Sequence, residues 1–129
     1  MLTNQIHPTE TQIAQLKTYP KNTPLVMLNI LKFKSRTITG ETGQVAYARY
    51  FKNAGFFVAE AGAKLLWKGN VHTSLIGDFD NQPHIVFLVE YPSVDHFFAM
   101  VSNPAYQKIA NDRSIALEYG GLIACQTSK

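Results

Sequence analysis

The segment HIVFLVEYPSVDHFFAMVSNPAYQKIANDR, residues 84–113, contains the order of elements from which the fold of this chain follows. Its first eight residues are mostly apolar and rich in β-forming types, which predicts a strand buried on both faces. Pro92 ends this strand, and Ser93 can cap a following helix. Asn103 and Pro104 then restart the helix in a new direction. The segment therefore predicts a strand followed by two consecutive helices.

Two further patterns supply the first strand and the first long helix of the core. Residues 25–33, LVMLNILKF, form an apolar run interrupted only by Asn29, which predicts another strand buried on both faces. Apolar residues recur at helical spacing over residues 44–61, which predicts an amphipathic helix that ends at Gly62.

Two more strands complete the pattern. Residues 63–77 are typical of a long strand that is bent or bulged near Gly69. Residues 122–127 are expected to form the last strand, after Gly120 and Gly121 end the preceding helix. The order β-α-β-β-α-β predicts an α+β, ferredoxin-like domain with an antiparallel sheet.

An extension of residues 1–22 is expected to precede the core of residues 25–127. Thr9 and Gln12 form a possible capping box, which predicts a short helix. We expect this helical extension to pack on the outside of a single domain that spans residues 1–129.

The strands predict a homodimer that forms through sheet faces. Leu25, Met27 and Leu31 alternate along the first strand with Val26, Leu28 and Ile30, so both faces are apolar. Because the helices cover only one face, a single copy would leave the other in water. A second copy of the chain, related by a two-fold axis, would cover the exposed sheet face.

Composition limits the classes of function. The 129 residues carry a net charge of +3, with basic residues spread along the chain, which bears on solubility more than on a partner. The single cysteine, Cys125, allows no internal disulfide and is expected to be buried. No apolar run approaches the ~20 residues that cross a bilayer, so no membrane partner and a cytoplasmic location are expected.

Several motifs together resemble a known family. They are NILKFK (29–34), YARYFKNAG (47–55), GAKLLWKGNV (62–71), GGLIA (120–124) and the order strand-Pro-Ser-helix-Pro-x-Tyr-helix-Arg. This combination resembles the uncharacterised dimeric α/β-barrel family catalogued as domain of unknown function thirteen-thirty. The resemblance implies two ferredoxin-like subunits whose sheets face each other as a barrel, with a pocket between sheet and helices. It implies no assigned activity.

Proteins with the same architecture include cofactor-independent monooxygenases, muconolactone isomerases and haem-binding chlorite dismutase-like proteins. The shared fold transfers none of these activities. An Asn, Trp and Arg trio also occurs among the small monooxygenases, and this chain has Asn29, Trp67 and Arg113.

Arg113 is the first candidate for a binding or catalytic residue. It follows Tyr106 and Ile109 on one helix face, and its guanidinium offers fixed donors that suit a carboxylate or enolate. The alternative is an ion pair with Glu90 or Asp95, or a stem packed on the core with its head in water.

The other candidates are expected around the same cavity. Asn29 lies in a buried strand and either bonds to neighbouring backbone or points into a pocket. Tyr47, Tyr106 and Trp67 are candidate pocket walls, with packing in the core as the alternative. His72, in phase with Leu66, Lys68 and Asn70, is a candidate general base.

Three other classes of function lack support in the sequence. No metal or other cofactor is predicted, because no histidine pair has a ligand-like spacing with a carboxylate. No nucleophile elbow or phosphate loop occurs. Nucleic-acid binding by an RNA-recognition fold is disfavoured, because Val86 stands where an aromatic should stack.

The leading hypothesis is therefore a homodimeric small-molecule-binding protein that acts on a small organic anion. In its enzymatic form it would be a cofactor-independent isomerase or a monooxygenase-like enzyme. The alternative is a non-catalytic structural or ligand-sensing dimer.

Overall fold

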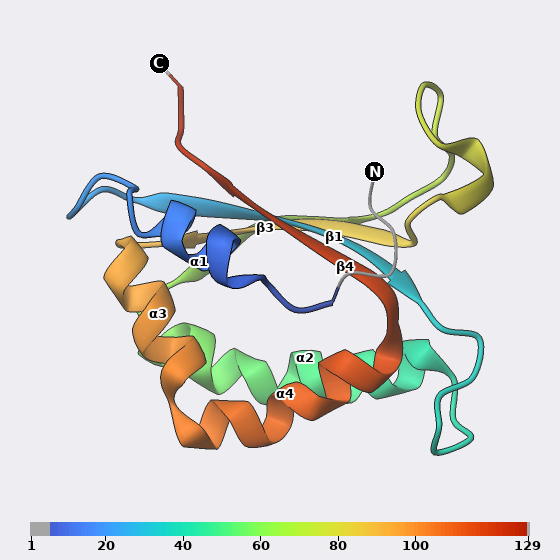
Figure 1. Ribbon diagram of the computed structural model, residues 1–129. Coiled ribbons are helices and arrows are strands. Elements are labelled where there is room, and N and C mark those ends of the chain that lie inside the picture. The colour runs from blue at the N-terminus through green and yellow to red at the C-terminus, as the bar shows by residue number, and fades with distance from the viewer. Residues whose placement is uncertain (1–5, 129) are drawn as a thin grey trace.

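Four antiparallel strands form one sheet in the computed structural model, which describes residues 6–128 (Figure 1). The strands are β1 (Leu25–Phe33), β2 (Lys64–Asn70), β3 (Ile85–Tyr91) and β4 (Leu117–Cys125). Their order across the sheet is β2-β3-β1-β4, the ferredoxin-like arrangement that the element order predicted. Residues 1–5 of the expected extension, and Lys129, lie outside the described residues.

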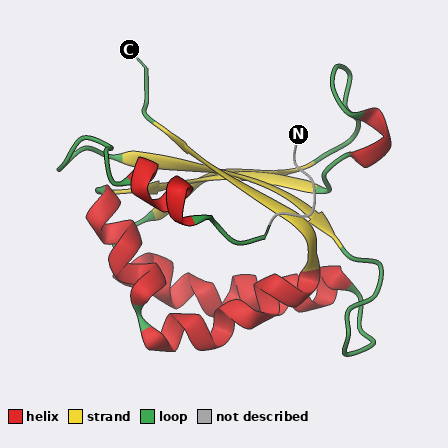
Figure 2. Cartoon of the chain, viewed as in Figure 1, coloured by secondary structure: helices red, strands yellow, loops and turns green. Residues whose placement is uncertain are grey.

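The helices gather on one side of this sheet (Figure 2). They are α1 (Glu10–Leu16), α2 (Gly43–Glu60), α3 (Val94–Ser102) and α4 (Pro104–Ala116), and η1 (Phe79–Asn81) is a short 3-10 turn. Within residues 6–128, no α-helix covers the opposite face of the sheet (Figure 1). Within residues 6–128, no helix has the length and apolar character needed to cross a membrane.

Local side-chain bonds start the helices where the sequence predicts. The Thr9 side chain accepts a hydrogen bond from the Gln12 backbone, and the reciprocal bond completes a capping box. Ser93 caps α3 by accepting from the His96 backbone. Asn103 caps α4 by accepting from the Ala105 backbone at 2.9 Å. These three caps confirm the predicted helix starts.

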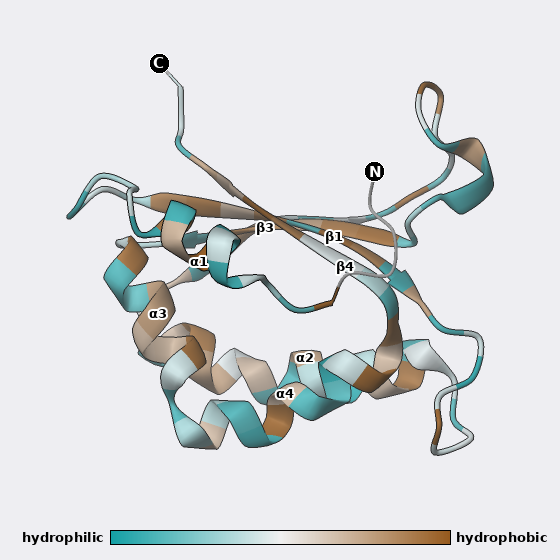
Figure 3. Cartoon of the chain, viewed as in Figure 1, coloured by the Kyte–Doolittle hydropathy of each residue, from teal (hydrophilic) through white to brown (hydrophobic). Residues whose placement is uncertain are grey.

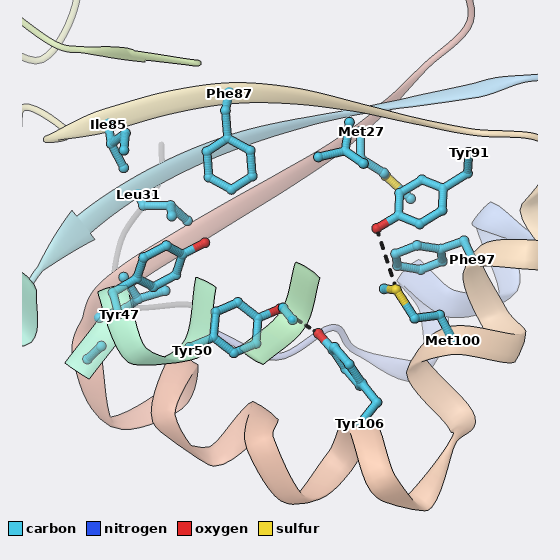
Figure 4. Close-up of a cluster of buried hydrophobic side chains, with 14 of the residues drawn as sticks. Met27, Leu31, Tyr47, Tyr50, Ile85, Phe87, Tyr91, Phe97, Met100 and Tyr106 are labelled. Atoms are coloured by element: carbon cyan, nitrogen blue, oxygen red, sulfur yellow. Dashed lines mark hydrogen bonds between the residues drawn. The ribbon is translucent and has the colours of Figure 1, made fainter. Parts of the chain in front are cut away.

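The core lies between the helices and the sheet face that they cover (Figure 4). Alternate residues of β1, Leu25, Met27 and Leu31, are buried there. On the other face, Val26, Leu28 and Ile30 lie beside residues of the neighbouring strands. Much of the sheet has the brown colour of hydrophobic residues (Figure 3). The expected division of β1 into two apolar faces is present.

Two strands differ from their predicted bounds. β2 ends at Asn70 because residues 71–84 form a loop that contains η1. The irregularity in β2 lies between Leu65 and Trp67 and not near Gly69. β4 begins at Leu117, so Gly120 and Gly121 lie inside the strand and do not end α4. Cys125 is partly exposed instead of buried.

The Asn103 cap supplies a test of the kink between α3 and α4. Asn103→Ala removes the acceptor for the Ala105 N–H, so we expect the free energy of unfolding to fall by about 1 kcal/mol. Urea unfolding of the variant measures this loss. Ser102→Ala, one residue away at an exposed position, is the matched control and should change the stability by less than about 0.5 kcal/mol.

Candidate functional site

A cavity of about 1480 Å³ lies between the covered face of the sheet and the helices. Its walls come from β1, β2, β3, β4, α2, α3 and α4, and from the N-terminal segment of residues 6–19 that contains α1. The extension was expected to pack on the outside of the domain. In the structure it instead forms one wall of the cavity, because Ile6, Leu16 and Tyr19 pack against the core.

The position of α4 keeps the cavity open. Tyr106 of α4 and Tyr50 of α2 share a hydrogen bond between their hydroxyl oxygens, 2.7 Å apart (Figure 4). The ring of Tyr106 also meets that of Phe57 edge to face, with ring centroids 5.8 Å apart. These contacts hold α4 along α2, and side chains of both helices line the space beneath the sheet.

Arg113 reaches this space from the last turn of α4. Its Nη1 donates to the backbone carbonyl of Ile6 at 3.1 Å, and its Nη2 donates to that of Gly120 at 3.3 Å. A Cβ at Gly120 would lie 2.7 Å from Nη2, so glycine makes room for the guanidinium against β4. The side chain thus connects α4, the last strand and the N-terminal segment.

No carboxylate neutralises Arg113 within residues 6–128. Of the two carboxylates that the sequence offered as ion-pair partners, Glu90 pairs with Lys64 at 3.6 Å, and Asp95 makes no ion pair in the described part of the chain. The described residues that line the cavity include Lys17 and Arg113 but no aspartate or glutamate. The cavity therefore has a positive electrostatic character.

Asn29 and Tyr47 line the same cavity from opposite layers. Asn29 of β1 is 8% exposed and donates its side-chain amide to the carbonyl of Met27 at 3.2 Å. Tyr47 of α2 is 4% exposed. Its hydroxyl points toward the sheet, whereas those of Tyr50 and Tyr106 point toward each other (Figure 4).

Burial keeps the cavity tyrosines protonated. It raises the pKa of Tyr47, Tyr50 and Tyr91 well above the ordinary value. The positive charge of Arg113 acts in the opposite direction on the pKa of Tyr47 and Tyr50, but the effect of burial is larger. Each phenol is consequently a neutral hydrogen-bonding group near neutral pH.

Four of five residues predicted to line the pocket do line this cavity, and the fifth does not. Arg113, Asn29, Tyr47 and Tyr106 meet at the cavity, whereas Trp67 does not. Trp67 is 57% exposed and pairs with Leu88, on the face of the sheet away from the helices. The bulge after Leu65 shifts the alternation of β2, so Trp67 does not line this cavity in the single chain, and its role as a pocket wall stays a prediction.

His72 is also absent from the residues that line the cavity. β2 ends at Asn70, and His72 lies exposed in the loop that follows. The alternation that would have aligned it with Leu66, Lys68 and Asn70 does not continue so far. His72 therefore does not line this cavity, and its role as a general base stays a prediction.

Two tyrosines and the N-terminal segment belong to the site although they were not predicted from the sequence. Tyr50 and Tyr91 line the cavity, as does the segment 6–19. Tyr50 follows Tyr47 by three residues on α2, a spacing that places both on one helix face and could have identified it. Within residues 6–128, no group of three or more His, Cys, Asp or Glu side chains is arranged to hold a metal ion.

The buried tyrosines predict how stability depends on alkaline pH. Below about pH 10 the folded and unfolded chains both hold the phenol protons. Above it the unfolded chain loses them while the folded chain retains them, so stability should fall as the pH rises. Urea midpoints from pH 8 to 11 should decline less steeply for Tyr47→Phe than for the wild type. Equal slopes would mean that the Tyr47 hydroxyl titrates normally in the folded protein.

Comparisons with known proteins place the chain in a family. Residues 38–125, more than half of the chain, match the family model described as Domain of unknown function (DUF1330). A protein of unknown function from Rhodopseudomonas palustris has 33% sequence identity and a TM-score of 0.92. The alignment covers 98% of this chain and 99% of that protein. None of the curated proteins matches the chain.

Two more distant structures are similar in fold alone. A dimeric protein of unknown function from Bacteroides fragilis, with a ferredoxin-like fold, has 9% identity and a TM-score of 0.55, over 84% of this chain and 100% of that one. SnoaB, a cofactor-independent oxygenase from Streptomyces nogalater, has 13% identity and a TM-score of 0.51, over 82% and 96%. The family model and the 33% identical relative together show that the chain belongs to the DUF1330 family, as its motifs suggested.

Proposed function

We propose that this protein binds a small organic anion in the cavity, with Arg113 as the partner of the negative charge. The observation that carries the proposal is the charge of the lining, in which the described residues include two basic side chains and no carboxylate. A partly enclosed cation without a counter-ion favours an anionic ligand. The ligand would supply the charge that the protein does not.

Arg113 has donors left for such a ligand. A guanidinium carries five N–H groups, and two of its nitrogens donate to the carbonyls of Ile6 and Gly120. These two bonds fix the orientation of the group. The remaining N–H groups suit the two oxygens of a carboxylate or the single oxygen of an enolate.

A cofactor-independent isomerase or monooxygenase-like activity would use the same arrangement. Arg113 would stabilise the charge of an enolate, and the protonated phenol of Tyr47 would donate a hydrogen bond to a second oxygen. The competing hypothesis, a non-catalytic structural or ligand-sensing dimer, is better suited to a filled interior with Arg113 in an ion pair. The open cavity favours the first hypothesis, as does a guanidinium that makes no ion pair within residues 6–128.

Binding can be tested with benzoate as the anionic probe and benzamide as its neutral counterpart. At about 100 times its dissociation constant, benzoate should stabilise the protein by about 2.7 kcal/mol, seen as a raised Tm. Benzamide should have a much smaller effect. Arg113→Met keeps the length of the stem but removes the donors, so its Kd for benzoate by calorimetry should rise by about 10- to 100-fold.

If Arg113→Met does not fold, a second variant can test the role of Arg113 in benzoate binding. Gly120→Ala places a methyl group against the guanidinium and should weaken benzoate binding without removing the charge. Gly55→Ala is its matched control, because nothing lies within 4 Å of a Cβ at that helical position. Unchanged benzoate binding in both Arg113→Met and Gly120→Ala would contradict the proposal.

The proposal also includes a homodimer, in the cytoplasmic location expected from the sequence. Val26, Leu28 and Ile30 of β1 form the open face together with Leu88 and Ile123, which are their neighbours in the sheet. Ile123 is 44% exposed in the single chain. A second copy that packed its own open face here would remove this apolar surface from water, and it could also cover Trp67.

Light scattering at micromolar concentration should therefore give twice the mass of one chain. Ile123→Lys places a charge on the open face, where burial of an unpaired charge is costly, and should convert the dimer to a monomer. Val45→Lys is the control, since Val45 is 54% exposed on the helical side of the molecule. A wild-type mass of one chain would rule out the dimer under these conditions.

A further inference from the structure

The hydroxyl of Tyr47 belongs to a buried side chain and has no hydrogen-bond partner among the described residues. No hydrogen bond to this oxygen occurs within residues 6–128, although the side chain is only 4% exposed. Every fully enclosed side-chain nitrogen or oxygen in the described residues does have a partner. The Tyr47 oxygen must consequently open onto the cavity that its side chain lines.

The carbonyl oxygen of the Asn29 side chain is in the same position. The amide nitrogen of Asn29 donates to Met27, but no donor in the described part of the chain reaches its oxygen. The same reasoning places this oxygen on the cavity. A protonated phenol and an amide oxygen, one on α2 and the other on β1, thus face a space with Arg113 in its wall.

The other tyrosines of the cavity do not share this property. Tyr50 and Tyr106 satisfy each other, and the hydroxyl of Tyr91 is directed at the sulfur of Met100, 4.0 Å away (Figure 4). Around Tyr47, the surroundings are apolar: the rings of Phe33, Tyr50 and Phe51 lie with centroids within 5.3–6.2 Å of its own. A polar group left unpaired in such a place costs free energy unless something in the cavity binds it.

We propose that the ligand carries, besides its negative charge, a hydroxyl group that accepts a hydrogen bond from Tyr47. The hydroxyl can donate its own proton to an acceptor such as the Asn29 oxygen, which a keto or ether oxygen cannot do. The ligand class is thus a hydroxy acid with an apolar body. This inference rests on the proposed function for its acidic group, whereas the Tyr47 subsite is argued separately.

The test compares benzoate with its 2-, 3- and 4-hydroxy derivatives by calorimetry. At least one hydroxybenzoate should bind the wild type more tightly than benzoate, by about 2- to 10-fold for one hydrogen bond. Tyr47→Phe should remove that gain, whereas the Kd of benzoate, which lacks the hydroxyl, should change by less than the gain. The variant is expected to fold, because the hydroxyl that it lacks makes no hydrogen bond within the described residues.

Tyr91→Phe is the matched control, since it also removes a phenol oxygen from the cavity wall but one that already has a partner. It should keep the gain of the hydroxybenzoates. The inference is overturned if no hydroxybenzoate exceeds benzoate, including the case in which none binds. It is also overturned if the gain survives in Tyr47→Phe.

Methyl benzoate and the methyl hydroxybenzoates separate this outcome from a failure of the Arg113 site. These esters carry no charge. If the hydroxyl raises their affinity for the wild type but not for Tyr47→Phe, the Tyr47 subsite is supported even when Arg113→Met does not change the Kd of benzoate. In the opposite case, benzoate binding depends on Arg113 while a hydroxyl changes the affinity of neither the benzoates nor the methyl esters. That result would support the anion site and contradict the Tyr47 subsite.

Discussion

The hydrogen bond between the hydroxyls of Tyr50 and Tyr106 connects the two longest helices, and the cavity depends on where it holds them. A helix that restarts at Pro104 can pack either on the sheet or on its neighbouring helix. Here the aromatic contacts of Tyr106 are with Tyr50 and Phe57 of α2, so α4 runs along α2. The sheet face beneath is then only partly covered, and the space between the layers remains as a cavity.

Arg113 closes this arrangement at the other end of α4. By binding the carbonyls of Ile6 and Gly120, it joins the N-terminal segment to the last strand through one charged group. Bonds from a charged donor are stronger than those between neutral groups, but a backbone carbonyl carries no negative charge to neutralise the guanidinium. The same side chain can therefore stabilise the fold and still attract an anion.

The fold was predictable from the sequence because its elements carry strong local signals. The apolar run of β1, the helical period of α2 and the caps at Ser93 and Asn103 are each set by neighbouring residues. Errors arose where tertiary contacts decide the outcome. Gly120 resembles a helix stop, yet it lies inside β4, where the absence of a Cβ admits the Arg113 guanidinium.

The site was predictable only in part, for a similar reason. Asn29, Tyr47, Tyr106 and Arg113 lie on regular elements whose faces follow from periodicity, and the structure brings all four to one cavity. Trp67 and His72 lie on or after β2, where a bulge and an early strand end break the alternation. Nothing in the pattern of residues 6–19 indicated that this segment would reach Arg113, a contact that spans 107 positions in the chain.

The polar groups of the cavity define its ligand more closely than the fold does. Solved structures with about 10% identity share the fold alone, and layers of sheet and helices can enclose cavities with different linings. In this chain the described lining combines one guanidinium, one unpaired phenol and one unpaired amide oxygen with Lys17 and an otherwise largely apolar and aromatic wall. A neutral hydrocarbon would leave all three unsatisfied, and a highly charged metabolite would have to bury charge against aromatic rings. The lining therefore favours a ligand with one negative charge, one uncharged hydroxyl and an apolar body.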